Sequence, residues 1–243
     1  MLPLTRHGFR EMLVGTLVLA LVAFGLEMAW WPLALLVVPV IIWLFAFFRD
    51  PNRPIPIEQH VMVSPADGKV SDIGEVDEPL VGGKAIRVGI FLSVFNVHVN
   101  RAPCDGKVIA VNYKKGKFIN AMKHNEASSD NESNTIVLGE LNGNRPVAVV
   151  KQIVGLIARR IVFTGRVDDV LRRGDRIGMI KFGSRTELTI PIWLDPEIKV
   201  KVGQTVRGGM DVIAFLRKPI HTTAPAARNP DEFEPLVGRE TPS

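Results

Sequence analysis

Two long apolar runs near the N-terminus constrain the fold of this chain more than any other feature. Residues 12–26 and 28–48 carry no charged side chain, and Glu27 alone separates them. The second run has 21 residues, enough to cross a hydrocarbon core of about 30 Å, whereas the first has 15 and crosses only with its flanks, or re-enters the same side. The pattern predicts a transmembrane or re-entrant helical hairpin.

The charges around the hairpin indicate its orientation. Arg6 and Arg10 precede the runs, and Arg49 and Arg53 follow them. The positive-inside tendency therefore places both ends in the cytoplasm, and with them the rest of the chain. A cleaved signal peptide with its small-residue site at 23–25 is the competing interpretation, but the second apolar run would stop transfer at once.

The rest of the chain is long enough for one compact domain and no more. Residues 50–56 (DPNRPIP) form a proline-rich connector that cannot extend a helix. We therefore expect a hairpin and linker over 1–54, a single domain over 55–220, and a disordered tail over 221–243, where apolar residues are few.

Short β-branched runs, punctuated by Gly, Asp and Asn, predict a mainly β domain. Residues 166–173 are the best candidate for a helix or turn within it, and the polar stretch 124–134 is typical of a loop that either connects strands or covers a ligand. The predicted strands are 69–73, 85–91, 97–100, 107–113, 135–138, 147–154, 161–163, 176–180, 187–191, 199–202 and 212–216.

A short internal repeat refines the fold prediction. Segments 65–70 (PADGKV) and 103–108 (PCDGKV) each indicate a turn that leads into a strand, and 200–209 (VKVGQTVRGG) resembles them in its glycines. This spacing is similar to that of lipoyl-like barrel-sandwich or hammerhead domains. A carrier domain would display a modifiable lysine within Met-Lys-Met or Asp-Lys-Ala, and the chain contains neither triplet.

The net charge and the cysteine content limit the possible binding partners and the possible covalent cross-links. A net charge of +5 suits either nucleic acid or an anionic membrane surface, and the apolar N-terminus favours the membrane, so no nucleic-acid partner is expected. Cys104 is the only cysteine, which excludes an intrachain disulfide and favours a small core residue. No metal site is predicted.

The dipeptide Gly183-Ser184, within 181–187 (KFGSRTE), carries distinctive chemistry. A serine hydroxyl can attack the preceding glycine carbonyl, and an acyl shift followed by β-elimination and loss of ammonia leaves a pyruvoyl group. Taken alone, Gly-Ser is ordinary turn chemistry. Its meaning here depends on the other motifs.

Three motifs occur in a specific order: 65–70 with Asp67, 95–106 (FNVHVNRAPCDG) with His98, and then Gly183-Ser184. In these motifs the chain resembles the phosphatidylserine decarboxylase family, in its shorter class with an N-terminal membrane hairpin, from about residue 45 to about residue 220. The resemblance implies a membrane enzyme of phospholipid biosynthesis that converts phosphatidylserine to phosphatidylethanolamine and CO2.

The resemblance also implies the site. Ser184 would become a covalent pyruvoyl cofactor, after cleavage into a β chain of residues 1–183 and an α chain of residues 184–243 that remain together as a heterodimer. Its ketone would form a Schiff base with the serine headgroup. His98 would act as the base that activates Ser184, and Asp67 would orient it. No lysine site with a phosphate cradle for pyridoxal phosphate is identified.

Three questions stay open on the sequence. The longer class has His-x-x-His-x-Pro, but here Arg101 occupies the second histidine position, so His98 could serve cleavage, decarboxylation or both. The lipid could be archaetidylserine, with ether-linked chains, and a non-enzymatic membrane-tethered adaptor would share the same turns. Several basic residues could bind lipid phosphate or be solvated strand-edge residues: Lys114, Lys115, Lys117, Arg159, Arg160 and Arg185.

Overall fold

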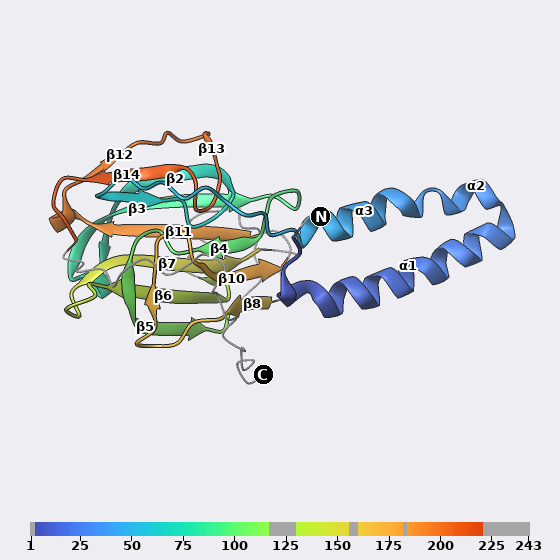
Figure 1. Cartoon of the computed structure of the whole chain (residues 1–243), viewed down its shortest axis with the longest axis horizontal. Helices are drawn as coiled ribbons and strands as arrows, with labels where there is room; N and C mark the ends of the chain where they lie inside the picture. Colours follow the sequence, from blue (N-terminus) through green and yellow to red (C-terminus); the bar gives the residue numbers. More distant parts are fainter. Residues whose placement is uncertain (1–2, 117–129, 156–159, 182–183, 221–243) are drawn as a thin grey trace.

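The structure is a computed structural model that describes residues 3–116, 130–155, 160–181 and 184–220. It has two parts: a long helical hairpin and the β domain from which the hairpin projects (Figure 1). The prediction of a mainly β domain preceded by a helical hairpin is confirmed.

The hairpin has one continuous arm and one interrupted arm. The 3-10 helix η1 (Arg6–Gly8) leads into α1 (Phe9–Ala29), and the chain returns through α2 (Trp31–Ala34) and α3 (Val37–Phe47). Within the described ranges, the helical segment Arg6–Ala29 is the one long and apolar enough to cross a membrane. At 1.5 Å per residue, α1 is about 31 Å long.

The two helical arms do not follow the lengths of the two apolar runs. The first run gains length from its flanks, because α1 continues through Glu27, whereas the second is interrupted between α2 and α3. Pro39 has no amide hydrogen to donate to the Leu35 carbonyl, and the amides of Leu36 and Val38 bond three residues back instead of four. Pro39 then lies in the first turn of α3, where no donor is needed.

The two ends of the hairpin meet beside the domain. The Thr5 amide donates to the Phe48 carbonyl at 2.8 Å, and the Asp50 amide donates to the Pro3 carbonyl at 2.7 Å. A hairpin inserted in a bilayer would therefore leave the described N-terminal end and the β domain on the same side.

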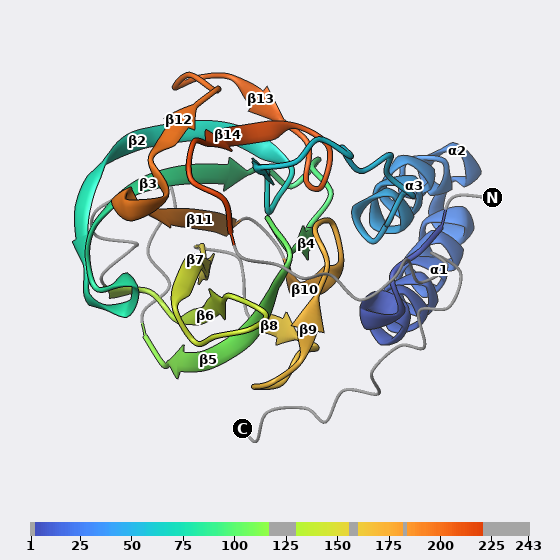
Figure 2. The same cartoon turned by 60° about the vertical axis from the view of Figure 1, so that its left-hand side comes forward.

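The described strands pair antiparallel in three sheets, of which the largest curls around the domain core (Figure 2). Its order is β13 (Thr205–Val206), β2 (Gly68–Glu78), β3 (Gly83–Leu92), β11 (Ser184–Pro191), β7 (Pro146–Val154), β6 (Ser133–Gly139), β5 (Gly106–Lys114) and β9 (Val170–Leu171). The second sheet is β1 (Val61–Val63), β14 (Val212–Leu216) and β12 (Pro196–Ile198), and the third is β4 (Val99–Arg101), β10 (Arg176–Lys181) and β8 (Arg160–Phe163).

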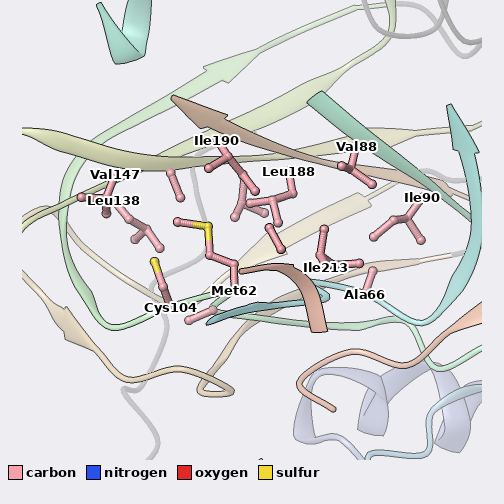
Figure 3. Packing of buried hydrophobic residues seen from close by; sticks show 14 of the residues in the cluster. Met62, Ala66, Val88, Ile90, Cys104, Leu138, Val147, Leu188, Ile190 and Ile213 are labelled. Atoms are coloured by element: carbon pink, nitrogen blue, oxygen red, sulfur yellow. The ribbon is translucent and has the colours of Figure 1, made fainter. Parts of the chain in front are cut away.

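The core lies inside the curled sheet, where Leu188 and Ile190 of β11 face Met62 and Ile213 of the second sheet (Figure 3). Cys104 is part of this core, as predicted, and burial raises the pKa of its thiol to about 12. The thiol is therefore protonated and unreactive at neutral pH.

Most predicted strands are present, with corrections at the shortest ones. Residues 199–202 lie outside any strand, between β12 and β13, and 166–173 contains a turn and β9 rather than a helix. The repeat is confirmed at Gly68 and Gly106, which open β2 and β5; a methyl group on either would press on a backbone carbonyl of the neighbouring strand. Residues 124–129 and the tail 221–243 lie outside the described residues.

Candidate active site

Ser184 is the first residue of β11, at the middle of the large sheet. It is paired with Leu92 of β3 on one side and Val154 of β7 on the other, and it is fully buried. Its Oγ atom has no hydrogen-bond partner among the described residues. Gly183 lies outside them. An unpaired buried hydroxyl costs about 1–3 kcal/mol, so this one needs an explanation other than stability.

His98 lies directly before β4 and is also fully buried. The His98 carbonyl accepts a hydrogen bond of 3.3 Å from the amide of Ile180 in β10, four residues before Ser184. The pairing of β4 with β10 therefore brings His98 beside the segment that leads to Ser184 (Figure 1).

The hydrogen bonds of His98 determine its tautomer. Nδ1 lies 3.0 Å from the carbonyl oxygen of Asn96, and a carbonyl only accepts, so Nδ1 carries the hydrogen. Nε2 then holds a lone pair, and it has no partner among the described residues. The pKa of His98 is lowered to about 4, mainly by burial; the hydrogen bond to the Asn96 carbonyl opposes this, and the charge of the nearby Arg49 adds to it. At neutral pH His98 is therefore an uncharged potential proton acceptor.

Asp67 is hydrogen-bonded to residues other than these two. One carboxylate oxygen accepts from Arg53 at 2.8 Å, and the other accepts from the Gly208 amide at 2.7 Å. No hydrogen bond in the described part of the chain joins Asp67 to His98 or Ser184. The His98 ring is hydrogen-bonded to the Asn96 carbonyl instead, and Asp67 ties the linker to the turn between β13 and β14.

Arg101, at the second histidine position of the longer class, also holds the linker. Its buried guanidinium donates to Asp50 at 2.9 Å, to the Pro51 carbonyl at 3.1 Å and to the Gly174 carbonyl at 3.0 Å. Arg176 donates to the other oxygen of Asp50. The sequence motif could not show this, because the partners come from the linker and from a distant turn.

A chain of buried amides, which sequence reasoning missed, ends next to Ser184. Asn134 donates to Gln152 at 3.1 Å, Gln152 donates to Asn100 at 2.9 Å, and Asn100 donates to the Thr186 hydroxyl at 3.1 Å. Thr186 lies two residues after Ser184, on the same face of β11. The hydroxyl oxygen of Thr186 is thus held by the last amide of this chain. The available signal was the presence of polar residues at inward positions of apolar strands.

Arg185 corrects a prediction, because it is neither a solvated edge residue nor exposed to lipid phosphate. Its side chain is fully buried and bonds to Glu187 at 2.9 Å, to Asp72 at 2.7 Å and to the Ser71 hydroxyl. A methyl group at Gly89 would overlap the guanidinium, so a larger residue there would displace Arg185 from these contacts. These contacts thus hold the position directly after Ser184 in place.

The other basic residues considered for binding lipid phosphate differ from Arg185. Lys114, Lys115 and Arg160 are exposed, while Lys117 and Arg159 lie outside the described residues.

Comparison with known proteins gives a consistent result over most of the chain. The sequence profile of the phosphatidylserine decarboxylase family matches residues 41–214. A phosphatidylserine decarboxylase proenzyme of Rhodopirellula baltica is 46% identical over 218 residues, which cover 88% of each chain. Proenzymes of the same name are 45% identical in Solidesulfovibrio magneticus, over 83% of this chain and 92% of the relative, and 37% identical in Cupriavidus pinatubonensis, over 88% and 95%.

Proposed function

Because the chain belongs to the phosphatidylserine decarboxylase family, we propose that it converts phosphatidylserine to phosphatidylethanolamine and CO2 after cutting itself between Gly183 and Ser184. The observation that carries the self-cleavage is a pair of buried atoms without described partners, Ser184 Oγ and His98 Nε2. The first can act as a nucleophile and the second as a base, and the backbone of His98 is bonded to Ile180, four residues before Ser184.

The chemistry of cleavage follows from these two groups. Ser184 Oγ forms a bond to the Gly183 carbonyl carbon while its proton passes to His98 Nε2. The peptide C–N bond then breaks, the nitrogen takes the proton, and an ester remains. Loss of the Ser184 α-proton with departure of the Gly183 carboxylate leaves a dehydroalanine. Water replaces its nitrogen, which leaves as ammonia, and a pyruvoyl group remains at position 184.

The surroundings of Ser184 suit such a group. The pyruvoyl ketone supplies an electron sink for the pair released when the substrate carboxylate leaves as CO2. Arg185, to which the group would be joined, is held by its ion pairs with Asp72 and Glu187, and Thr186 is held by Asn100. Burial excludes bulk water from both.

The sheet explains how two fragments would stay together. β11 is hydrogen-bonded on one side to β3 and on the other to β7, so the fragment 184–243 would remain inside the sheet built by the fragment 1–183. We propose that the hairpin and linker 1–54 tether the domain 55–220 to the cytoplasmic face of the cell membrane, with Arg6 and Arg10 facing the anionic leaflet.

The activity is tested with the full-length protein in vesicles that contain phosphatidylserine labelled in its serine carboxylate. We expect labelled CO2 to be released in equal amount to the phosphatidylethanolamine formed, and treatment with borohydride in the presence of substrate to stop the release. Vesicles with ether-linked serine lipid compare the two lipid classes. Absence of CO2 from cleaved, folded protein with either lipid would contradict the proposal.

The role of Asp67 stays a prediction, and its pairing with Arg53 provides a matched test. Asp67→Asn and Arg53→Met both remove the same buried ion pair, so each should lower stability by a similar amount, about 3 kcal/mol. If Asp67 assists His98, only Asp67→Asn should also slow self-cleavage, by roughly 10-fold or more. Equal cleavage rates in the two variants, measured by gel after pulse labelling, would restrict Asp67 to holding the linker.

A further inference from the structure

The base of the membrane hairpin contacts the candidate base directly. Phe47, the last residue of α3, places its ring on the ring of His98, with centroids 4.3 Å apart and planes inclined by 34°. Phe47 is 1% exposed and His98 is completely buried. A residue of the predicted membrane segment therefore forms part of the wall around His98.

Phe47 is itself held in a packed cluster that joins the hairpin to the domain. Phe48 meets its ring edge-on at a centroid distance of 5.0 Å, and Met12 and Leu44 complete the hairpin side of the cluster. Met179 of β10 provides the domain side. Gly8 approaches Phe48 so closely that a methyl group there would overlap the ring. The position of the Phe47 ring is thus defined by both parts of the molecule.

Two polar contacts connect the hairpin to the segments that carry the site. Lys181, three residues before Ser184, donates to Glu11 of α1 at 2.6 Å. Arg49, just after the hairpin, donates to the carbonyl of Phe95, three residues before His98, at 2.7 Å. The hairpin therefore contacts the segments leading to both site residues, besides the ring of His98 itself.

We propose that Phe47 is a positioning residue of the active site, which holds the His98 ring and keeps water from it, so that the membrane hairpin completes the site rather than only tethering it. The inference rests on the proposed function, because the position of His98 matters only if His98 acts as the base. It predicts that a disturbed hairpin base changes the chemistry of the site and not only the location of the protein.

The charges around His98 determine how the proposal can be measured. Arg49 faces it from the linker, and Lys181 on β10 is paired with Glu11 on α1. Burial holds the pKa of His98 near 4, below its ordinary value of 6.5. If Phe47 is shortened, water reaches the His98 ring and the pKa of His98 rises toward the ordinary value. His98 then becomes protonated at a higher pH. The acid limb of the pH profile, where the cleavage rate falls as the pH is lowered, therefore moves to a higher pH.

The test follows self-cleavage as a function of pH for newly translated full-length protein in lipid nanodiscs. We expect the wild-type rate to fall only near pH 4, where His98 becomes protonated. In Phe47→Ala, the pKa of His98 should approach its ordinary value of 6.5. The cleavage rate of this variant should then fall about 10-fold one pH unit below that pKa. Phe47→Leu, which keeps apolar volume but not the ring face, should show a smaller shift of the same sign.

Phe48→Leu is the matched control, because Phe48 is buried in the same cluster one residue away, whereas Phe47 is the residue whose ring lies on that of His98. Because Phe48 supports the Phe47 ring without being the ring that lies on His98, the acid limb of this variant should move by less than that of either Phe47 variant. An unshifted limb in both Phe47 variants, or equal shifts in the Phe47 and Phe48 variants, would overturn the inference. An uncut wild-type protein would instead refute the proposed function.

Should Phe47→Ala fail to fold, the His98 ring is titrated by NMR in uncut Ser184→Ala protein, with and without Phe47→Leu. A higher pKa in the double variant supports the positioning role, and an unchanged pKa contradicts it.

Discussion

Replacing Ser184 by alanine is expected to abolish both self-cleavage and decarboxylation while leaving the protein at least as stable as before. The chemistry is lost because no other hydroxyl occupies the position of the nucleophile. The stability is kept because the buried Oγ atom has no described hydrogen-bond partner, so its removal gives up no interaction and relieves a desolvation cost of about 1 kcal/mol.

A second buried serine provides the control for this variant. Ser64 Oγ donates to the Ala66 carbonyl at 2.6 Å. Ser64→Ala should therefore lower the free energy of unfolding by about 1 kcal/mol and leave cleavage intact, which is the reverse pattern. Thermal unfolding and gel analysis of the two variants measure both effects. A Ser184→Ala protein that still cleaves, or that is markedly less stable, would remove Ser184 from the role assigned to it.

Replacing His98 by glutamine should slow self-cleavage by roughly 10²–10⁴-fold, the usual contribution of a positioned general base. The glutamine amide can still donate to the Asn96 carbonyl, but it offers no nitrogen lone pair to accept the Ser184 proton. The residual rate should also lose the acid limb near pH 4 that the depressed pKa of His98 gives the wild type.

The same substitution at His60, an exposed residue before β1, serves as the control. His60→Gln should cleave at the wild-type rate, and pulse labelling of both variants gives the comparison. Wild-type cleavage by the His98→Gln protein would show that another group takes the proton, and would leave the lone pair of His98 without a function in this step.

The hairpin, the mainly β domain and the family could be predicted from the sequence, because each depends on short segments of neighbouring residues. Apolar length gives the hairpin, alternating β-branched runs give the strands, and the three motifs in order give the family. The strands that escaped prediction, such as β9 and β13, contain two residues each, too few for any periodicity.

What the sequence could not show depends on contacts between distant segments. Phe47 is read locally as part of an apolar membrane run, yet its ring lies on His98. Arg185 is read locally as a surface charge, but Asp72 and Glu187 make its burial possible. The break before α3 was also missed, because the tolerance of Pro39 depends on where a helix begins, and composition does not reveal that position.

The comparisons also decide between the alternatives left open by the motifs. Relatives named as decarboxylase proenzymes match this chain over most of its length, which sets aside a non-enzymatic adaptor. The preference for diacyl or ether-linked lipid is a question for the vesicle assay.

The most direct test of the account is the intact mass of the denatured full-length protein, with hydroxylamine or borohydride to trap a ketone, beside the Ser184→Ala variant. We predict two chains in the wild type, divided between Gly183 and Ser184, with a reducible carbonyl at the start of the smaller chain and neither feature in the variant. A single uncut chain from folded, membrane-extracted wild-type protein would contradict it.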